Sequence, residues 1–160
     1  PTTNLVGKEG QGFKIAMIML DGARIGVAAQ ALGIAKGAID ESVKYMHERV
    51  QFGKPIATLQ GLQWYIADMA TKTEASKWLI YRAASLKDEG QPYSTEAAMA
   101  KLNASENARI VTNLALQIHG GYGYMKDYPL ERMSRDAKIT EIYEGTSEIH
   151  KVVIARAVIG

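Results

Sequence analysis

Apolar residues recur every three or four positions along three long stretches of this 160-residue chain, from Phe13 to about Val50, from about Ile56 to Asp88, and from Ser94 to Ile118. This spacing places apolar side chains on one side of an α-helix, so it predicts three long helices. The expected inner faces are Ile25, Ala28, Leu32, Ala35, Ile39, Val43, Met46 and Val50 on the first; Leu59, Leu62, Ile66, Met69, Ile80 and Ala83 on the second; and Ala97, Ala100, Ala104, Ala108, Val111, Ala115 and Ile118 on the third.

Turn-forming residues separate these stretches. They are Gly53 with Pro55, Gly90 with Pro92, and Gly120 with Gly121. Ser94-Thr95-Glu96 is expected to cap the third helix, and Tyr122 to Pro129 to form a loop. Leu130 to Ala137 then predicts a short helix, and Thr146 to Val158 a last one. No segment has a strand pattern of useful length. The sequence therefore predicts an all-α fold, an antiparallel four-helix bundle with an extra short helix.

Composition narrows the class of protein. The length suits one domain with a sizeable core. The net charge of +2 is too small to indicate a nucleic-acid or membrane partner. Asp21, Arg24 and Lys36 interrupt the most apolar segment, so no membrane span is expected. There is no cysteine, which excludes disulfides and thiolate metal sites. The opening Pro1-Thr2-Thr3-Asn4 predicts a segment of a longer protein.

A metal site is not expected. Four-helix bundles often hold two iron ions through Glu-x-x-His pairs, in which a glutamate precedes the histidine by three positions. The residues at that position before His47, His119 and His150 are Lys44, Leu116 and Ser147. We therefore predict no metal ligands, and we interpret His119 as a buried or capping histidine rather than an acid–base catalyst.

One carboxylate precedes the last helix at a position suited to chemistry. Glu144 is followed by Gly145, which lets the backbone approach a ligand closely, and then by Thr146-Ser147-Glu148. Hydroxyl residues cap a helix start and an acid in the first turn favours the positive end of the helix dipole. Two interpretations remain open at this point, a solvated glutamate before a capped surface helix and a ligand site at a helix N-terminus.

Three other polar positions have both a structural and a functional interpretation. Arg49 either ends a helix favourably or binds a phosphate through its planar fork of donors. Asp21 and Arg24 form a helical ion pair or face a ligand. The segment Gln117 to Gly123 has more glycine than a helix stop requires, and paired glycines expose backbone N–H groups to flat or charged ligands.

Together these segments resemble the C-terminal helical domain of the acyl-CoA dehydrogenase family, most closely its short-chain or butyryl-CoA members. The resemblance assigns residues 1–160 to that single domain, without the N-terminal helical and middle β-domains of the family. The matching segments, in the order of the family, are Leu20 to Arg24, Arg49 to Pro55, Gln117 to Gly121, and Arg135 to Glu148.

The resemblance implies a flavin enzyme that desaturates an acyl-CoA thioester between its α and β carbons. Glu144 matches the base that removes the α-proton. Relatives that place the base on the first helix use the position of Ala23, which cannot act as a base. Asp21, Arg24 and Gly145 match positions that face the substrate.

The resemblance also implies FAD as the cofactor. Positions like Arg49, Gln60 and Gln117-Ile118-His119-Gly120-Gly121 contact the FAD of a neighbouring subunit, and positions like Thr146, Ser147 and Glu148 contact the FAD of their own subunit. A homodimer or homotetramer, an electron-transfer flavoprotein as acceptor, and the bacterial cytoplasm or mitochondrial matrix as location are implied as well. The isolated domain is expected to be inactive.

Two alternatives belong to other classes of protein. One is a helical module that only drives oligomerisation. The other is an acyl-CoA-binding bundle without flavin, which only the pair of Asp21 and Arg24 would support.

Overall fold

The computed structural model describes residues 1–160 as a helical protein with one minimal hairpin. The five α-helices are α1 (Gly12–Glu48), α2 (Gln60–Asp88), α3 (Ser94–His119), α4 (Leu130–Ile139) and α5 (Ser147–Ile159). Three short 3₁₀ helices are η1 (Thr2–Asn4), η2 (Ile56–Thr58) and η3 (Gly120–Tyr124), and the strands β1 (Val50–Gln51) and β2 (Lys54–Pro55) pair antiparallel. The predicted all-α bundle is confirmed.

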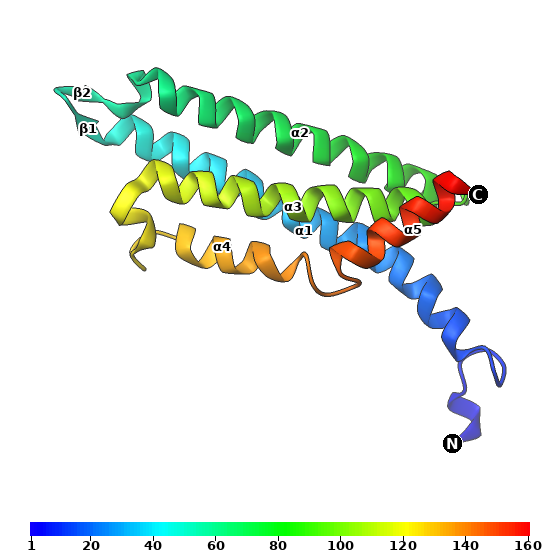
Figure 1. Cartoon of the computed structure of the whole chain (residues 1–160). Helices are drawn as coiled ribbons and strands as arrows, with labels where there is room; N and C mark the ends of the chain where they lie inside the picture. Colours follow the sequence, from blue (N-terminus) through cyan, green and yellow to red (C-terminus); the bar gives the residue numbers. More distant parts are fainter.

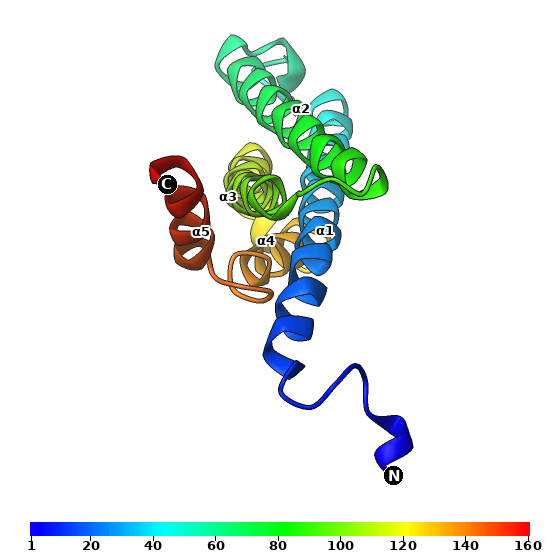
Figure 2. The same ribbon diagram turned by 90° about the vertical axis from the view of Figure 1, so that its right-hand side faces the viewer.

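Helix α3 lies at the centre of the bundle, and the other helices surround it (Figures 1 and 2). Helices α1, α2 and α3 are joined by short connections and alternate in direction, and the short helix α4 runs back along α1 and α3 (Figure 1). Helix α5 packs chiefly against α3 (Figure 2). Any residue on the buried faces of α3 can therefore reach the connections between the other elements.

Small side chains form the core between α1 and α3. The predicted inner face of α3 is buried along its whole length, from Ala97 to Ile118. On α1 the prediction is only partly correct, because the most deeply buried positions are Ala28, Ala31, Ala35 and Ala38, whereas the larger Ile25, Leu32 and Ile39 pack at the edge and Val43 and Val50 are exposed. Alanine lets two helix axes approach closely, so the close contact with α3 selects the alanine side of α1.

The helix boundaries follow the predicted breaks, with two corrections at the N-termini. Tyr93, not Ser94, is the N-cap of α3, and no side chain caps that helix, because Ser94 lies within its first turn. Thr146 is the N-cap of α5, but its side chain makes no capping hydrogen bond to the helix start. At the other end of α3, Gly120 has φ 58°, a conformation that glycine adopts without a side-chain clash.

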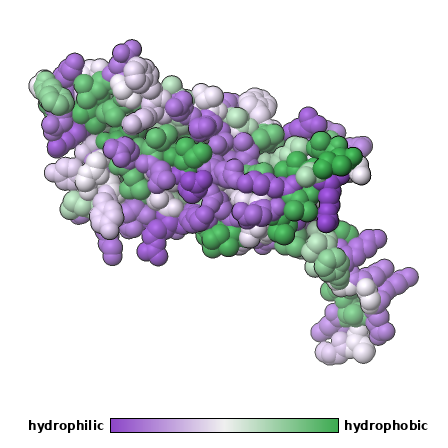
Figure 3. All heavy atoms as spheres, in the orientation of Figure 1, coloured by the Kyte–Doolittle hydropathy of each residue, from purple (hydrophilic) through white to green (hydrophobic).

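The first turns of α1 extend away from the bundle (Figure 1). Their large apolar residues Phe13, Ile18 and Met19 are exposed, and Figure 3 shows hydrophobic residues on this projecting segment and around α5. By length and composition α1 could cross a membrane, because its most apolar 18-residue window contains no more than two charged residues. The charges of Asp21, Arg24 and Lys36 interrupt the apolar run as expected, but they do not by themselves exclude a span. One such helix is weak support for a span, because core helices of soluble proteins meet the same criteria.

Candidate functional site

The connection between α4 and α5 contains two consecutive residues with left-handed backbone. Glu144 has φ 54° and Gly145 has φ 97°. Such a φ is costly for a residue with a side chain, by about 1–3 kcal/mol, and persists only where the surroundings fix it. The N–H of Ser147 closes the connection by donating to the carbonyl of Glu141 at 3.1 Å. We call residues 140–147 the Glu144 turn, in which the predicted base is half-buried.

A buried lysine of α3 binds the backbone of the Glu144 turn. Lys101 is fully buried, and its Nζ donates a hydrogen bond of 2.6 Å to the backbone carbonyl of Gly145. Burial and the charge of Arg24 together outweigh the nearby carboxylates of Glu141, Glu144 and Glu148 and lower the pKa of the Lys101 ammonium to about 8. The ammonium remains mostly protonated at neutral pH, so the bond to Gly145 is charge-assisted.

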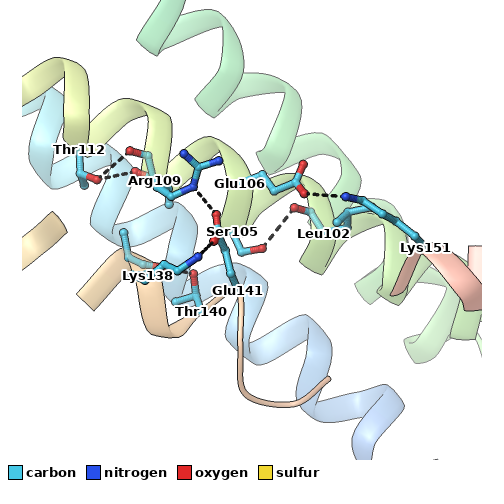
Figure 4. A network of polar contacts seen from close by, with 11 residues as sticks. Leu102, Ser105, Glu106, Arg109, Thr112, Lys138, Thr140, Glu141 and Lys151 are labelled. Carbon is cyan, nitrogen blue, oxygen red and sulfur yellow. Dashed lines mark hydrogen bonds and ion pairs between the residues drawn. The ribbon is translucent and has the colours of Figure 1, made fainter. Parts of the chain in front are cut away.

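An ion-pair network holds the other end of the same turn (Figure 4). The buried carboxylate of Glu141 accepts a 2.6 Å hydrogen bond from Nε of Arg109 on α3 and another from Nζ of Lys138 on α4. Burial tends to raise the pKa of the Glu141 carboxyl, but the bonds from Lys138 and Arg109 outweigh it and lower the pKa. Glu141 therefore stays ionised, and the turn is attached to α3 at two points.

The predicted pair on α1 is formed. Nη1 of Arg24 donates to Oδ1 of Asp21 at 2.6 Å, and Arg24 is buried while Asp21 is partly exposed. The Nε of Arg24 has no hydrogen-bond partner within the protein. Because the charge of Arg24 affects the pKa of both Lys101 and His150, the pair lies near the Glu144 turn. The predicted helical ion pair is thus confirmed, and a role of Asp21 and Arg24 toward a ligand stays a prediction.

A buried histidine of α5 packs against the glycine of the turn. His150 is fully buried, and neither ring nitrogen has a hydrogen-bond partner in the protein. A side chain at Gly145 would lie 3.2 Å from Cε1 of this ring, so the close packing requires glycine there. Burial, together with the charges of Lys101 and Arg24, lowers the pKa of the His150 imidazole to about 4. The ring is neutral at physiological pH.

A second concave site lies at the C-terminal end of α3. We call this open pocket of about 590 Å³ the α3-end pocket. Its lining comes from the end of α1, the hairpin, the start of α2, and the glycine-rich segment after α3, and consists of Tyr45, Arg49, Gln51, Ile56, Leu62, Gln117, Ile118, His119, Gly120, Gly121, Tyr122 and Met125. The segments Arg49 to Pro55 and Gln117 to Gly121, far apart in sequence, thus meet in one place.

Aromatic rings build one wall of the α3-end pocket. The rings of Tyr45 and His119 stack with centroids 4.1 Å apart, and the edge of Tyr128 packs on both. Nδ1 of His119 donates to the carbonyl of Ala115 at 2.9 Å, which leaves Nε2 as an acceptor without a partner. Burial lowers the pKa of the His119 imidazole, against that hydrogen bond. His119 is thus a buried neutral histidine, as the sequence predicts.

Arg49 supplies the positive charge of this pocket. Its guanidinium carbon lies 5.3 Å from the centre of the Tyr122 ring, within the range of a cation–π interaction. Arg49 forms no ion pair in the structure. Its donors therefore remain available to an anionic ligand.

The predicted site residues fall into two groups at opposite ends of α3. Arg49 and the five residues Gln117 to Gly121 line the α3-end pocket, whereas Gln60, the first residue of α2, is exposed and outside its lining. Glu144, Gly145, Thr146, Ser147 and Glu148 belong to the other end, with Asp21 and Arg24 nearby. Lys101 and Gln117 are 16 residues apart on α3, or about 24 Å at 1.5 Å per residue.

Sequence reasoning missed Lys101, His150 and the bond between Arg109 and Glu141. The sequence signal that could have identified Lys101 is a single cation among the buried alanines of α3, which are Ala97, Ala100 and Ala104. His150 was considered only as a metal ligand, and its burial against Gly145 depends on the path of the turn.

Comparison with known proteins decides the family. Residues 10–159 match the model of the acyl-CoA dehydrogenase C-terminal domain. The chain belongs to the acyl-CoA dehydrogenase family. This finding confirms the resemblance drawn from the motifs, and with it the helical domain type.

Three relatives of this acyl-CoA dehydrogenase domain are especially similar. It is 79% identical to acryloyl-CoA reductase (NADH) of Anaerotignum propionicum over 158 residues, which are 99% of this chain and 40% of the relative. The structure of butyryl-CoA dehydrogenase from Megasphaera elsdenii matches with a TM-score of 0.99 and 52% identity, over 100% of this chain and 42% of that one. A third match is a chain in a structure of the electron transferring flavoprotein of Acidaminococcus fermentans, concerned with flavin-based electron bifurcation. It has a TM-score of 0.98 and 61% identity, and the match covers 99% of this chain and 42% of that one. The chain thus spans about two fifths of these relatives.

Proposed function

We propose that this domain forms part of a flavin-dependent acyl-CoA dehydrogenase that interconverts a short-chain acyl-CoA and its α,β-unsaturated form. The observation that supports this best is the Glu144 turn, in which a half-buried carboxylate has a left-handed backbone held by the buried Lys101. A solvated glutamate before a helix needs neither the unusual backbone nor the buried cation. In this proposal Glu144 is the base, and Asp21, Arg24 and Gly145 lie beside the thioester.

The chemistry required of Glu144 is a proton transfer at carbon. Its carboxylate accepts the proton from the α-carbon in desaturation, and its carboxylic acid returns that proton in the reverse direction. Bound FAD supplies the hydride acceptor for the β-carbon. The protein contributes the position of the carboxylate, which the attachment of the Glu144 turn to α3 restricts.

The residues of the α3-end pocket fit an anionic cofactor with flat rings. The guanidinium of Arg49 has no anionic partner, Nε2 of His119 is an acceptor without a donor, and Gly120 and Gly121 have no side chains to block a close approach. These features support FAD at this pocket. Along α3, the rise from Lys101, which binds the Glu144 turn, to Gln117 of the pocket is about 24 Å. This placement of the two sites toward opposite ends of α3 supports two different FAD molecules, one from a neighbouring subunit, and hence a homodimer or homotetramer.

Exposed aromatic side chains on α2 also support an oligomer. Trp64 and Trp78 are each more than 60% exposed, and large apolar surfaces mark contacts with other proteins or domains. We propose an electron-transfer flavoprotein as the redox partner, which the similarity to a chain in such a structure supports.

We expect Arg49→Ala to weaken retention of FAD by about 10- to 100-fold, because a hydrogen bond to a charged group contributes about 1.5–3 kcal/mol. Flavin absorbance per protein after dialysis, together with the melting temperature, measures the effect in the complete enzyme. Lys54→Ala, which removes a cation of the neighbouring hairpin outside the pocket, is the matched control. Unchanged flavin content with a lower melting temperature would reduce Arg49 to a structural role.

The direction of the reaction is a second question. The 79% identity to an acryloyl-CoA reductase favours reduction of a three-carbon enoyl-CoA as the alternative to desaturation of butyryl-CoA. Turnover of the complete enzyme with saturated and α,β-unsaturated acyl-CoA of three to eight carbons, with an artificial electron acceptor or donor, separates these cases. A protein without bound flavin and without turnover in either direction would favour the oligomerisation module.

A further inference from the structure

Lys101 carries a buried ammonium group that has no carboxylate partner. Its side chain has no exposed surface, and it belongs to none of the ion pairs of the structure. Its one hydrogen-bond partner is the carbonyl of Gly145. Burial of an unpaired ammonium is unfavourable, and the positions that flank it on this side of α3 are alanines. Packing alone therefore gives no reason for a lysine here.

The Glu144 turn has few other restraints on its backbone. The bond from Ser147 to Glu141 closes the turn, and the bonds before it come from the end of α4. Lys101 is the only side chain of another helix that hydrogen-bonds the backbone of residues 140–147. Since that bond falls on the residue directly after Glu144, it restrains the second of the two left-handed residues.

Helix α3 thus holds the turn at two points. Lys101 binds Gly145 after the base, and Arg109 binds the side chain of Glu141 before it. The two anchors are eight residues apart on one rigid helix, or about 12 Å. The pair of Arg109 and Glu141 is partly exposed, whereas the bond of Lys101 is enclosed, so Lys101 restricts the turn more strongly.

We propose that Lys101 is the positioning residue of Glu144: its bond to the Gly145 carbonyl sets the place of the catalytic carboxylate. This inference rests on the proposed function, in which Glu144 is the base. Lys101 does not touch the substrate in this role. It acts through the backbone of the turn.

The test compares wild type, Lys101→Met, Lys101→Arg and Thr112→Val in the complete flavoprotein, with butyryl-CoA and propionyl-CoA as substrates. Lys101→Met keeps the length of the side chain but removes the donor and the charge. Thr112→Val is the matched control, because Thr112 is also a fully buried polar residue of α3 but bonds only to carbonyls of its own helix. Flavin content and melting temperature are measured for each variant.

We expect Lys101→Met to lower kcat per bound flavin by about 10- to 100-fold, with KM within about threefold of wild type, because displacement of a catalytic group by about 1 Å costs that much. Lys101→Arg keeps a cationic donor at this position, so it should recover part of the lost kcat. Thr112→Val changes the melting temperature and neither kinetic property.

A Lys101→Met enzyme with kcat per flavin within threefold of wild type overturns the inference. Equal losses in Lys101→Met and Thr112→Val do so as well, since they indicate a general effect on α3. If Lys101→Met does not fold, Lys101→Gln is measured against the same criteria. An inactive wild type that binds no flavin contradicts the proposed function itself and is recognised before any variant is compared.

Discussion

Glu144→Gln in the complete enzyme is expected to abolish turnover while FAD remains bound. General-base catalysis contributes about 10²–10⁴-fold, so kcat should fall by at least that range if no other group replaces the carboxylate. Ala23 at the alternative position of the first helix offers none. The amide has nearly the same shape, and the Lys101 bond is to the backbone, so the Glu144 turn is retained.

The same variant also tests both directions of the reaction. In the proposed mechanism one carboxyl group takes and returns the α-proton, so oxidation of a saturated acyl-CoA and reduction of its unsaturated form should be lost by the same factor. Glu106→Gln is the matched control, since Glu106 pairs with Lys151 of α5 outside both candidate sites. Turnover of Glu144→Gln within threefold of wild type would place the base on another residue.

Acidification is expected to destabilise the bundle through His150. The pKa of this imidazole is about 4 in the folded protein and about 6.5 in an unfolded chain, so the unfolded state binds more protons between these values. The stabilisation is fully present above about pH 6.5 and is lost as the pH falls toward 4. One pKa unit corresponds to about 1.4 kcal/mol, so His150 alone accounts for a loss of about 3 kcal/mol of unfolding free energy.

Urea unfolding of wild type and His150→Gln between pH 7 and 4 measures this effect, since the amide does not titrate. The variant should lose about 3 kcal/mol less than wild type over this range. The exposed His47→Gln is the matched control and should keep the wild-type dependence. Parallel curves for wild type and His150→Gln would show that the buried imidazole does not govern acid stability.

The arrangement of helices followed from the local sequence. Spacing of apolar residues located α1, α2 and α3, and the glycines and prolines between them located the breaks, because both depend on neighbours within a few positions. The motifs at Glu144, Arg49 and Gln117 to Gly121 were also visible as residue types in a fixed order. These motifs were sufficient to identify the family, and the match over residues 10–159 confirms that identification.

Tertiary structure decided which side of α1 is buried. The predicted face included Ala28 and Ala35, which are buried, but it also included Val43, which is exposed. It omitted Ala31 and Ala38, which the close contact with α3 buries completely. Periodicity fixes the existence of an apolar side but leaves its rotation by one residue open. The size of the facing side chains determines that rotation, since closely packed helices exclude larger groups.

Tertiary structure also decided what surrounds the candidate base. Lys101 precedes Gly145 by 44 residues, and Arg109 precedes Glu141 by 32, so no local pattern connects them. Their pairing depends on how closely the turn after α4 packs against α3. From its residue type alone, a lysine next to alanines in a helix is expected to be exposed to solvent. Only the packing of α5 and the Glu144 turn over α3 encloses this ammonium and gives it the carbonyl of Gly145 as its partner.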